Sequence, residues 1–309
     1  MKYAFTNGKI LDGSRDMQVQ TGRCILVKNG KIHDIVSDTT YLSGYTKIDL
    51  KGHYILPGLI NMHVHLAGSG KPQKKQRDNE KLVNTIMSTS LTRAIAYRMV
   101  AGFAKDELLS GVTTIRTVGG LGDFDTRLRD EIKAGSKIGP RILASNQGIS
   151  VPGELKMPPE MVRAVCEKTH ADGYLVAAHV ESPEGVRVAL ENGVDSIEHG
   201  AKLTDEMVKL FKERGAFLCT TISPALPYAL FDRSITNTTK RSAELTDIDS
   251  ITGSIEKGKA ADLIVTAQNP LKDLKALRNL EMVISGGRFI EHPKIKKRKQ
   301  VEAELDKFL

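Results

Sequence analysis

From residue 55 onward, short apolar segments alternate with longer amphipathic segments, and this alternation constrains the fold more than any other feature. Short apolar runs predict strands, and apolar residues spaced three or four apart predict helices. The predicted strands are 55–66, 112–118, 140–149, 174–180, 195–199 and 217–222. The predicted helices are 81–109, 124–134, 159–171, 183–192 and 204–214. Strands that alternate with helices are typical of parallel β/α units, so we expect an α/β fold.

Two of these helices carry more specific signals. Ser182 followed by Pro183 predicts a helix that begins with a serine N-cap and a proline in its first turn. In the long helix 81–109, one set of apolar residues is spaced for a buried stripe. These residues are Leu82, Ile86, Ile95 and Met99. We therefore expect this stripe to pack against the β/α body rather than to enter a membrane.

Both ends of the chain have a different pattern, that of short strands separated by turns. Residues 1–54 include an Asn29-Gly30 hairpin turn, and strands return at 261–265, 280–284 and 288–290. Neither end has enough strands to be stable alone, so we expect the two ends to pair. The predicted domains are a small β domain (1–54 with 253–293), a β/α domain (55–252) and a basic tail (294–309).

Composition and charge are those of an ordinary globular protein. Hydrophobic residues make up 40% and charged residues 27%, which does not indicate disorder. The net charge is +8, and the tail contributes six basic residues against three acidic ones. No aromatic residues interleave with these bases, so a solvated tail is favoured over a nucleic-acid site. We expect no nucleic-acid partner.

The three cysteines are widely spaced and contain no Cys-x-x-Cys pair. Cys24, Cys166 and Cys219 thus predict neither a disulfide framework nor a thiolate metal site, and they fit a reducing compartment. The first eight residues lack the apolar core of a signal peptide, and no run of about 18 apolar residues occurs. We expect a cytoplasmic chain with no membrane partner.

Four histidines stand at the ends of three predicted strands. His63 and His65 are two residues apart, so they point to the same side of their strand and can hold one metal ion. His179 and His199 close two later strands, where β/α barrels build active sites. Either pair alone could be structural. Four converging imidazoles would suit one divalent ion or part of a two-ion site.

Six ordered motifs resemble the amidohydrolase superfamily, most closely the imidazolonepropionase-like and prolidase-like metal-dependent hydrolases. They run in the family's order over most of the chain. They are LPGLINMHVH (56–65), GVTTIR (111–116), GPRILAS (139–145), VAAH (176–179), DSIEHG (195–200) and GSIEKGKAADL (253–263).

This resemblance implies a TIM-type (β/α)8 barrel with a composite β-sandwich built from both termini. It implies hydrolysis of amide, cyclic amide or dipeptide C–N bonds by a metal-activated water, with zinc as the expected ion and a small molecule as substrate. It carries over His63 and His65 as ligands of the first strand, and His179 and His199 as ligands of the fifth and sixth strands.

Two elements of the family pattern are not found in this chain. They are the fourth strand with its lysine and the eighth strand with its aspartate. Lys156 does not fit the lysine because no strand precedes it. Six recognisable strands and a barrel span shorter than the ~250 residues of a complete barrel predict an incomplete barrel. Its open edges predict lower stability or self-association into a homo-oligomer.

The catalytic base is therefore unknown from the sequence. Glu181, Asp123 and Asp125 are possible substitutes, and we favour the interpretation that they are solvated surface carboxylates. Tyr228 could meet a substrate, although a packed loop aromatic is favoured. Two hypotheses follow, a metal-dependent amidohydrolase and an inactive shortened homologue that keeps histidine metal binding. Substrate identity depends on strand-to-helix loops and stays open.

Overall fold

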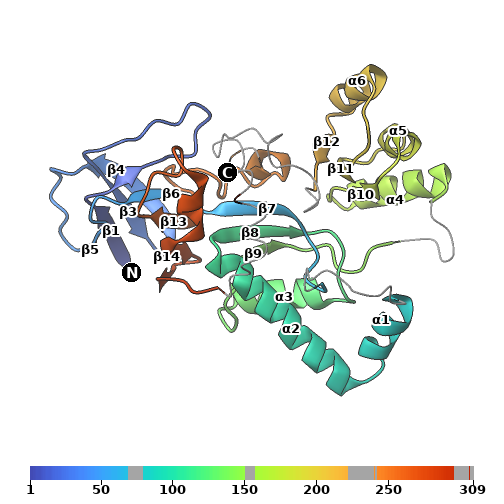
Figure 1. Cartoon of the computed structure of the whole chain (residues 1–309), viewed down its shortest axis with the longest axis horizontal. Helices are drawn as coiled ribbons and strands as arrows, with labels where there is room; N and C mark the ends of the chain where they lie inside the picture. Colours follow the sequence, from blue (N-terminus) through green and yellow to red (C-terminus); the bar gives the residue numbers. More distant parts are fainter. Residues whose placement is uncertain (69–78, 150–156, 222–239, 241, 296–305, 307–309) are drawn as a thin grey trace. The chain divides into compact units, whose positions relative to one another are not determined.

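A computed structural model gives the structure of the chain and describes residues 1–68, 79–149, 157–221, 240, 242–295 and 306 (Figure 1). The chain divides into two compact units. The first unit combines Met1–Asn146 with Tyr228–Leu309, and the second is Gln147–Pro227. Each unit contains its own apolar core.

Two sheets in the first unit are built from the ends of the chain. One has the order β4-β3-β1-β5. Its strands are β1 (Lys2–Thr6), β3 (Arg23–Lys28), β4 (Lys31–Ser37) and β5 (Thr46–Asp49). The other has the order β15-β14-β13-β6-β2. Its strands are β2 (Lys9–Ile10), β6 (Tyr54–Pro57), β13 (Leu263–Thr266), β14 (Leu280–Ser285) and β15 (Arg288–Glu291), with a short 3-10 helix η2 (Leu274–Arg278) before β14.

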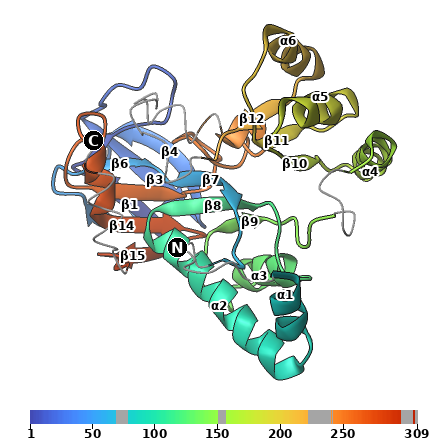
Figure 2. The ribbon, with the colours of Figure 1, turned by 45° about the vertical axis from the view of Figure 1, so that its right-hand side comes forward.

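These two sheets share one core, to which residues from both ends of the chain contribute. Phe5 and Ile25 of the first sheet pack in the same cluster as Ile55, Leu263 and Ile284 of the second. Figure 2 shows the blue N-terminal strands beside the red C-terminal strands. In the antiparallel β6–β13 ladder, β13 pairs with residues 54–57, most of which the prediction assigned to the β/α domain. The β-sandwich and the domain boundaries stay predictions.

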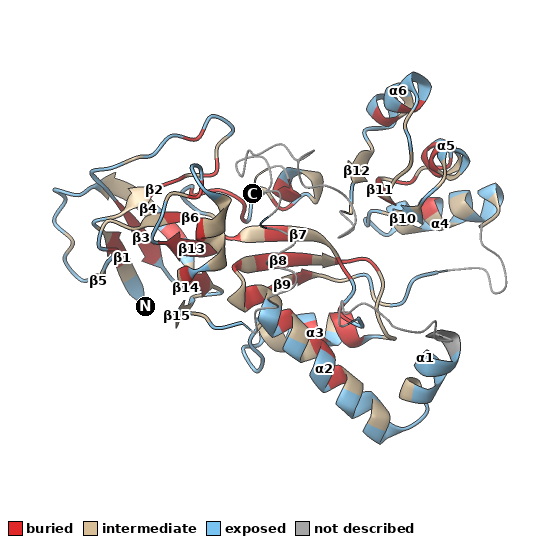
Figure 3. Ribbon diagram, viewed as in Figure 1, coloured by how far each residue is buried: buried red, intermediate tan, exposed pale blue. Residues whose placement is uncertain are grey.

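A parallel three-stranded sheet follows in the first unit, with the order β7-β8-β9. Its strands are β7 (Leu59–Val64), β8 (Val112–Thr117) and β9 (Arg141–Leu143), and its helices are α1 (Asn79–Met87), α2 (Ser90–Leu109) and α3 (Phe124–Lys133). Figure 3 shows buried residues along β7 and β8 and on one side of α2. The core between sheet and helices includes Val64, Ala104, Ile115 and Leu128.

The structure corrects the predicted strand 55–66, which is two strands in two different sheets. β6 belongs to the terminal sheet and β7 to the parallel sheet, and the chain changes sheet at Gly58. A Cβ atom at Gly58 would lie 2.2 Å from Thr113 Oγ1, so only glycine fits this close crossing. The Pro57-Gly58 pair within this apolar run is the sequence signal for the change, because such pairs commonly mark turns.

The predicted helix 81–109 is also two elements, α1 and α2. Thr89 caps the start of α2, and its side chain accepts a hydrogen bond from the Thr92 amide in a capping box. The predicted buried stripe is wrong. Leu82, Ile95 and Met99 are 42%, 55% and 54% exposed. Apolar residues lie on two faces of α2, and the buried face is that of Tyr97, Val100, Ala104 and Leu108.

The second unit is a smaller β/α layer with a parallel sheet of order β10-β11-β12. Its strands are β10 (Ala177–Val180), β11 (Ser196–His199) and β12 (Phe217–Cys219), and its helices are α4 (Pro159–Ala171), α5 (Pro183–Glu191) and α6 (Asp205–Arg214). Ile197 and Leu190 are fully buried in the core of this unit.

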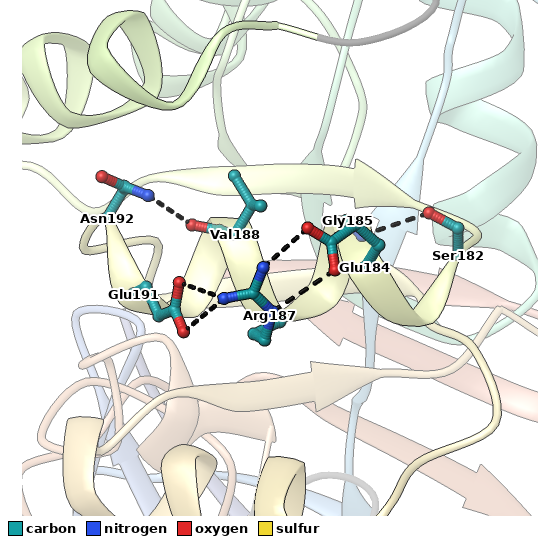
Figure 4. A network of polar contacts seen from close by, with 7 residues as sticks. All are labelled: Ser182, Glu184, Gly185, Arg187, Val188, Glu191 and Asn192. Atoms are coloured by element: carbon teal, nitrogen blue, oxygen red, sulfur yellow. Dashed lines mark hydrogen bonds and ion pairs between the residues drawn. The ribbon is translucent and has the colours of Figure 1, made fainter.

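Helix α5 begins as the sequence predicts. Ser182 is its N-cap, and the Ser182 hydroxyl accepts a hydrogen bond from the Gly185 amide at 3.2 Å (Figure 4). On the outer face, Arg187 donates to Glu184 and to Glu191, one helical turn to each side. Such exposed pairs contribute little to stability.

The six strands β7 to β12 correspond to the six strands predicted for the β/α body, although most are shorter. The predicted strand 140–149 is reduced to Arg141–Leu143, and 174–180 to Ala177–Val180. Among the described residues, no helix has the length and apolar character needed to cross a membrane.

Candidate metal centre

The first histidine pair lies at the carboxyl end of β7. Val64 and Leu66 point into the core beneath the helices, whereas His63 is half-buried and His65 is exposed. This alternation places both imidazoles on the face away from the helices. The two Nε2 atoms are 3.1 Å apart. A tetrahedral zinc ion with bonds of about 2.0–2.1 Å holds two nitrogens roughly 3.3 Å apart, so this pair fits a metal ion.

A hydrogen bond at Nδ1 of His65 fixes the tautomer of this imidazole. His65 Nδ1 lies 3.0 Å from the carbonyl oxygen of Gly119. A carbonyl oxygen only accepts, so Nδ1 carries the proton and neutral His65 presents a lone pair at Nε2. The backbone at Gly119 favours glycine because its φ is +138°, and a Cβ there would also make a tight contact of 3.2 Å with His65 Nδ1.

Neighbouring polar groups hold the end of β7 in place. The Asn61 side-chain oxygen accepts from the His63 amide at 3.2 Å, and Arg116 Nε donates to the Met62 carbonyl at 2.8 Å. The Asn61 amide group also reaches Glu107 on α2, at 3.5 Å. Burial is the main cause of a raised pKa at Glu107, although the Asn61 hydrogen bond opposes it.

Asp125 departs from its expected role as a solvated surface carboxylate. It is buried at 1% exposure, whereas Asp123 and Glu181 are exposed as expected. A Cβ at Gly120 would lie 2.6 Å from Asp125 Oδ2, so the carboxylate packs directly on the turn that binds His65. Within the described part of the chain, Asp125 Oδ2 has no hydrogen-bond partner, and burial raises the pKa of this carboxyl. The Gly119-Gly120 pair was the sequence signal for this close packing.

The second histidine pair lies at the carboxyl ends of β10 and β11. His179 Nδ1 and His199 Nε2 are 2.8 Å apart, and His199 Nδ1 contacts the Thr221 hydroxyl. Alternation along β11 would direct His199 towards the helices, but His199 has φ +70°. This left-handed conformation at the strand end turns the ring back to His179, at a conformational cost typical of functional sites.

The structure also identifies two residues near this pair that the sequence did not single out. Glu198 is fully buried on β11, and Cys219 is half-buried on β12. The parallel register places Glu198 beside His179 on one side and beside Cys219 on the other. Their signal in the sequence was the alternation within Ser196–His199, where Glu198 shares a face with Ser196.

Each histidine pair is formed within its own unit, His63 and His65 in the first and His179 and His199 in the second. Tyr228 and Lys156 lie outside the described residues, as do most residues of the basic tail. The expected role of Tyr228 therefore stays a prediction.

Comparison with known proteins gives a consistent assignment. Residues 54–154 match the model of the amidohydrolase family. An imidazolonepropionase from Vibrio vulnificus is 30% identical over 150 residues, which cover 43% of this chain and 36% of that protein. An uncharacterised protein from Mycobacterium tuberculosis is 25% identical over 195 residues, covering 55% of this chain and 51% of that protein. The chain thus spans about half, or less, of the length of these curated relatives.

A solved structure agrees over nearly the whole chain. It is that of a protein from Bifidobacterium longum classed as a prolidase, with a TM-score of 0.81 and 26% identity. The alignment covers 99% of this chain and 98% of that one. These matches identify the chain as a relative of the amidohydrolase superfamily, and the predicted α/β class agrees with the structure. The barrel and its incompleteness stay predictions. The resemblance in the sequence motifs is confirmed.

Proposed function

We propose that this chain is a metal-dependent hydrolase that cleaves C–N bonds in amides, cyclic amides or dipeptides. The observation that carries the proposal is the His63–His65 pair, whose Nε2 atoms are 3.1 Å apart. The Nδ1–H group of His65 donates to the Gly119 carbonyl oxygen, which directs Nε2 of His65 towards His63. The imidazolonepropionase and prolidase relatives support the substrate class. His63, His65, His179 and His199 are the proposed ligands, and zinc is the proposed ion.

The roles of the residues follow from their contacts. When bound, a divalent ion lowers the pKa of a water molecule and polarises a substrate carbonyl. The Nδ1–H group of His65 donates to the Gly119 carbonyl oxygen, so His65 would bind a metal ion through Nε2. The His63 Nε2 atom lies 3.1 Å from His65 Nε2, so these two nitrogens are the pair that would hold a metal ion.

We also propose the kind of substrate, the cellular location and the self-association of the chain. A small-molecule substrate suits the family, and three cysteines outside any disulfide support a reducing, cytoplasmic location. Self-association of the shortened barrel belongs to the proposal as well. It would be detected as a mass above 33.8 kDa in sedimentation or light scattering.

The test is hydrolysis of a cyclic amide and of Xaa-Pro dipeptides by purified protein loaded with Zn²⁺, with metal content measured in parallel. We expect turnover that is lost in His63→Ala, together with a lower metal content. His33→Ala is the matched control, because His33 lies on β4 in the terminal sheet and is exposed.

Bound metal without turnover at any loading would contradict the hydrolase proposal. That result would support the second candidate, an inactive homologue that keeps histidine metal binding. The matched regions cover only 51% and 36% of these two curated relatives, which favours keeping this candidate in the experiment.

A further inference from the structure

The turn between β8 and α3 determines where the Gly119 carbonyl oxygen lies. This turn spans residues 118–123 and contains three glycines, of which Gly119 and Gly122 have φ angles of +138° and +51°. Glycine has more conformational freedom than any other residue, so a turn rich in glycine is weakly ordered by its own sequence. Contacts from outside the turn are therefore needed to keep the Gly119 carbonyl oxygen 3.0 Å from His65 Nδ1.

Asn146, in the segment that follows β9, supplies two such contacts. Its carbonyl oxygen accepts a hydrogen bond at 2.7 Å from the amide of Gly120, the neighbour of Gly119. Its side-chain Oδ1 accepts a hydrogen bond at 3.0 Å from the Thr126 amide, in the first turn of α3. Asn146 thus binds the β8–α3 turn near its beginning and just beyond its end. All of these residues belong to the first unit.

The contact with Thr126 takes the place of a helix cap. Asp123 occupies the N-cap position of α3, but its side chain makes no capping hydrogen bond. An N-cap side chain ordinarily accepts from the second or third amide of its helix, and Thr126 is the third residue of α3. Here the Asn146 side chain is the acceptor instead. The start of α3 is therefore attached to the segment after β9.

The backbone conformation of Asn146 suits it to this place. Its φ is +59°, in the left-handed region, which asparagine adopts more readily than most residues with a side chain. The preceding residue is attached to the sheet, because the Ser145 amide donates to Thr117 Oγ1 at 3.0 Å. Asn146 thus connects the carboxyl ends of β8 and β9 with the turn that contacts His65.

We propose that Asn146 is a positioning residue for the metal ligand His65. Asn146 holds the β8–α3 turn through its left-handed backbone and its side-chain oxygen. The turn holds the Gly119 carbonyl oxygen, which keeps the His65 proton on Nδ1 and leaves Nε2 facing His63. The inference rests on the proposed function, because it takes His65 as a metal ligand.

The first measurement is the tautomer of His65 in the metal-free protein. Long-range ¹H–¹⁵N correlation spectra of ¹⁵N-histidine-labelled protein report it at about pH 8, where imidazoles are neutral. The His65 signals are assigned by their absence from His65→Ala. The wild-type ring should carry its proton on Nδ1. Asn146→Ala loses the side-chain acceptor and disfavours the left-handed backbone, so a substantial fraction of its His65 rings should carry the proton on Nε2.

The second measurement is the Zn²⁺ dissociation constant, in competition with a chromophoric chelator. Asn146→Ala should weaken Zn²⁺ binding about tenfold or more, as loss of an outer contact to a metal-binding histidine typically does. Asn146→Gly loses the side chain but keeps the left-handed backbone, so it should weaken binding by about threefold at most and keep the Nδ1 tautomer.

Asn269→Ala is the matched control. The Asn269 side chain accepts from the Leu271 amide at 3.0 Å, and its carbonyl oxygen accepts from the Lys272 amide at 3.0 Å. It thus makes the same two kinds of contact as Asn146, but in the loop after β13. Its loss should lower the free energy of unfolding and leave both the His65 tautomer and the Zn²⁺ affinity unchanged.

The outcomes separate this inference from the proposed function. A wild-type His65 with its proton on Nε2 would overturn the inference without any variant. So would Asn146→Ala with the wild-type tautomer and affinity, or equal losses in Asn146→Ala and Asn146→Gly. Absence of Zn²⁺ binding by the wild type would overturn both proposals. Bound Zn²⁺ without turnover, together with the expected changes in Asn146→Ala, would overturn the hydrolase proposal alone.

Discussion

Arg141 Nη2 lies 3.1 Å from Asp262 Oδ2, so an ion pair joins β9 of the parallel sheet to the segment that leads into β13. Asp262 is almost fully buried, and its other oxygen accepts from the Ser285 hydroxyl and the Gly286 amide. One carboxylate thus connects the first β/α sheet with the C-terminal strands. The connection favours this one arrangement of the elements, because burying a carboxylate is costly in free energy unless its oxygens are paired.

We expect Asp262→Ala to destabilise the protein by roughly 2–4 kcal/mol, because buried donors on several elements lose their acceptor. The measurement is the free energy of unfolding in urea. Asp34→Asn is the control, since the Lys257–Asp34 pair is exposed and contributes little. Equal stability of the Asp262 variant and the wild type would contradict a structural role for this connection.

Gly120→Ala should weaken metal binding about 10- to 100-fold, because its Cβ would collide with the Asp125 carboxylate and displace the turn that orients His65. The measurement is the metal dissociation constant in competition with a chromophoric chelator. The double variant Gly120→Ala/Asp125→Ala should recover most of the affinity, because it removes the group that is struck. An additive loss in the double variant would show that the collision is not the cause.

Gly102→Ala should stabilise the protein by up to about 1 kcal/mol, because alanine favours the helix and nothing lies within 4 Å of the new Cβ. Chemical unfolding measures the change. Gly111→Ala is the contrasting variant and should destabilise, since Gly111 has φ +95° and its Cβ would lie 2.8 Å from Leu280. A Gly102 variant less stable than the wild type would mean that this face of α2 is covered.

The raised pKa of Glu107 predicts a pH dependence of stability with a definite sign. Burial is its main cause, and the folded pKa lies above the ordinary value of 4.5. The folded state therefore binds this proton more tightly than the unfolded state, and stability is lost as pH rises from about 4.5 through the folded pKa. Glu107→Gln removes this loss. We expect the variant to match the wild type near pH 3.5 and to be the more stable protein at pH 7.

Urea unfolding at a series of pH values measures this effect. Asp34→Asn provides a control of opposite sign, because the Ile35 amide hydrogen bond, followed by Lys257, lowers the pKa of Asp34. Because this pair is exposed, the carboxylate contributes only a little stability above about pH 3.8, and this small contribution is lost as pH falls through its folded pKa. A Glu107 variant whose stability parallels the wild type at every pH would refute the assignment.

The order of strands and helices in the β/α body was predictable, because hydrophobic periodicity depends on local sequence alone. The helices 159–171 and 183–192 illustrate this, since α4 and α5 match them to within one residue. Pro57-Gly58 signals a break in the strand, but the close packing of Gly58 against Thr113 was not predictable, because Thr113 is distant in the sequence. The buried face of α2 was likewise decided by its contacts with β8 and α3 rather than by spacing along the helix.

In the candidate metal centre, too, some features were predictable from the sequence and others were not. His63 and His65 share a face because of strand alternation, which the sequence alone predicts. Asp125 and Glu198 could not be recognised, since burial depends on packing around a turn and on the register of neighbouring strands. His199 reaches His179 through a left-handed backbone conformation, which its position before Gly200 does not reveal.

The ladder between β6 and β13 has a consequence for synthesis on the ribosome. β6 leaves the exit tunnel long before its partner, because Leu56 pairs with Ile264 across more than 200 positions. Translation at about 5–20 residues per second leaves this apolar edge without its neighbour for roughly ten seconds or more. During that interval an open strand edge is a template for aggregation, so recovery of native protein should depend on chaperones that bind nascent chains.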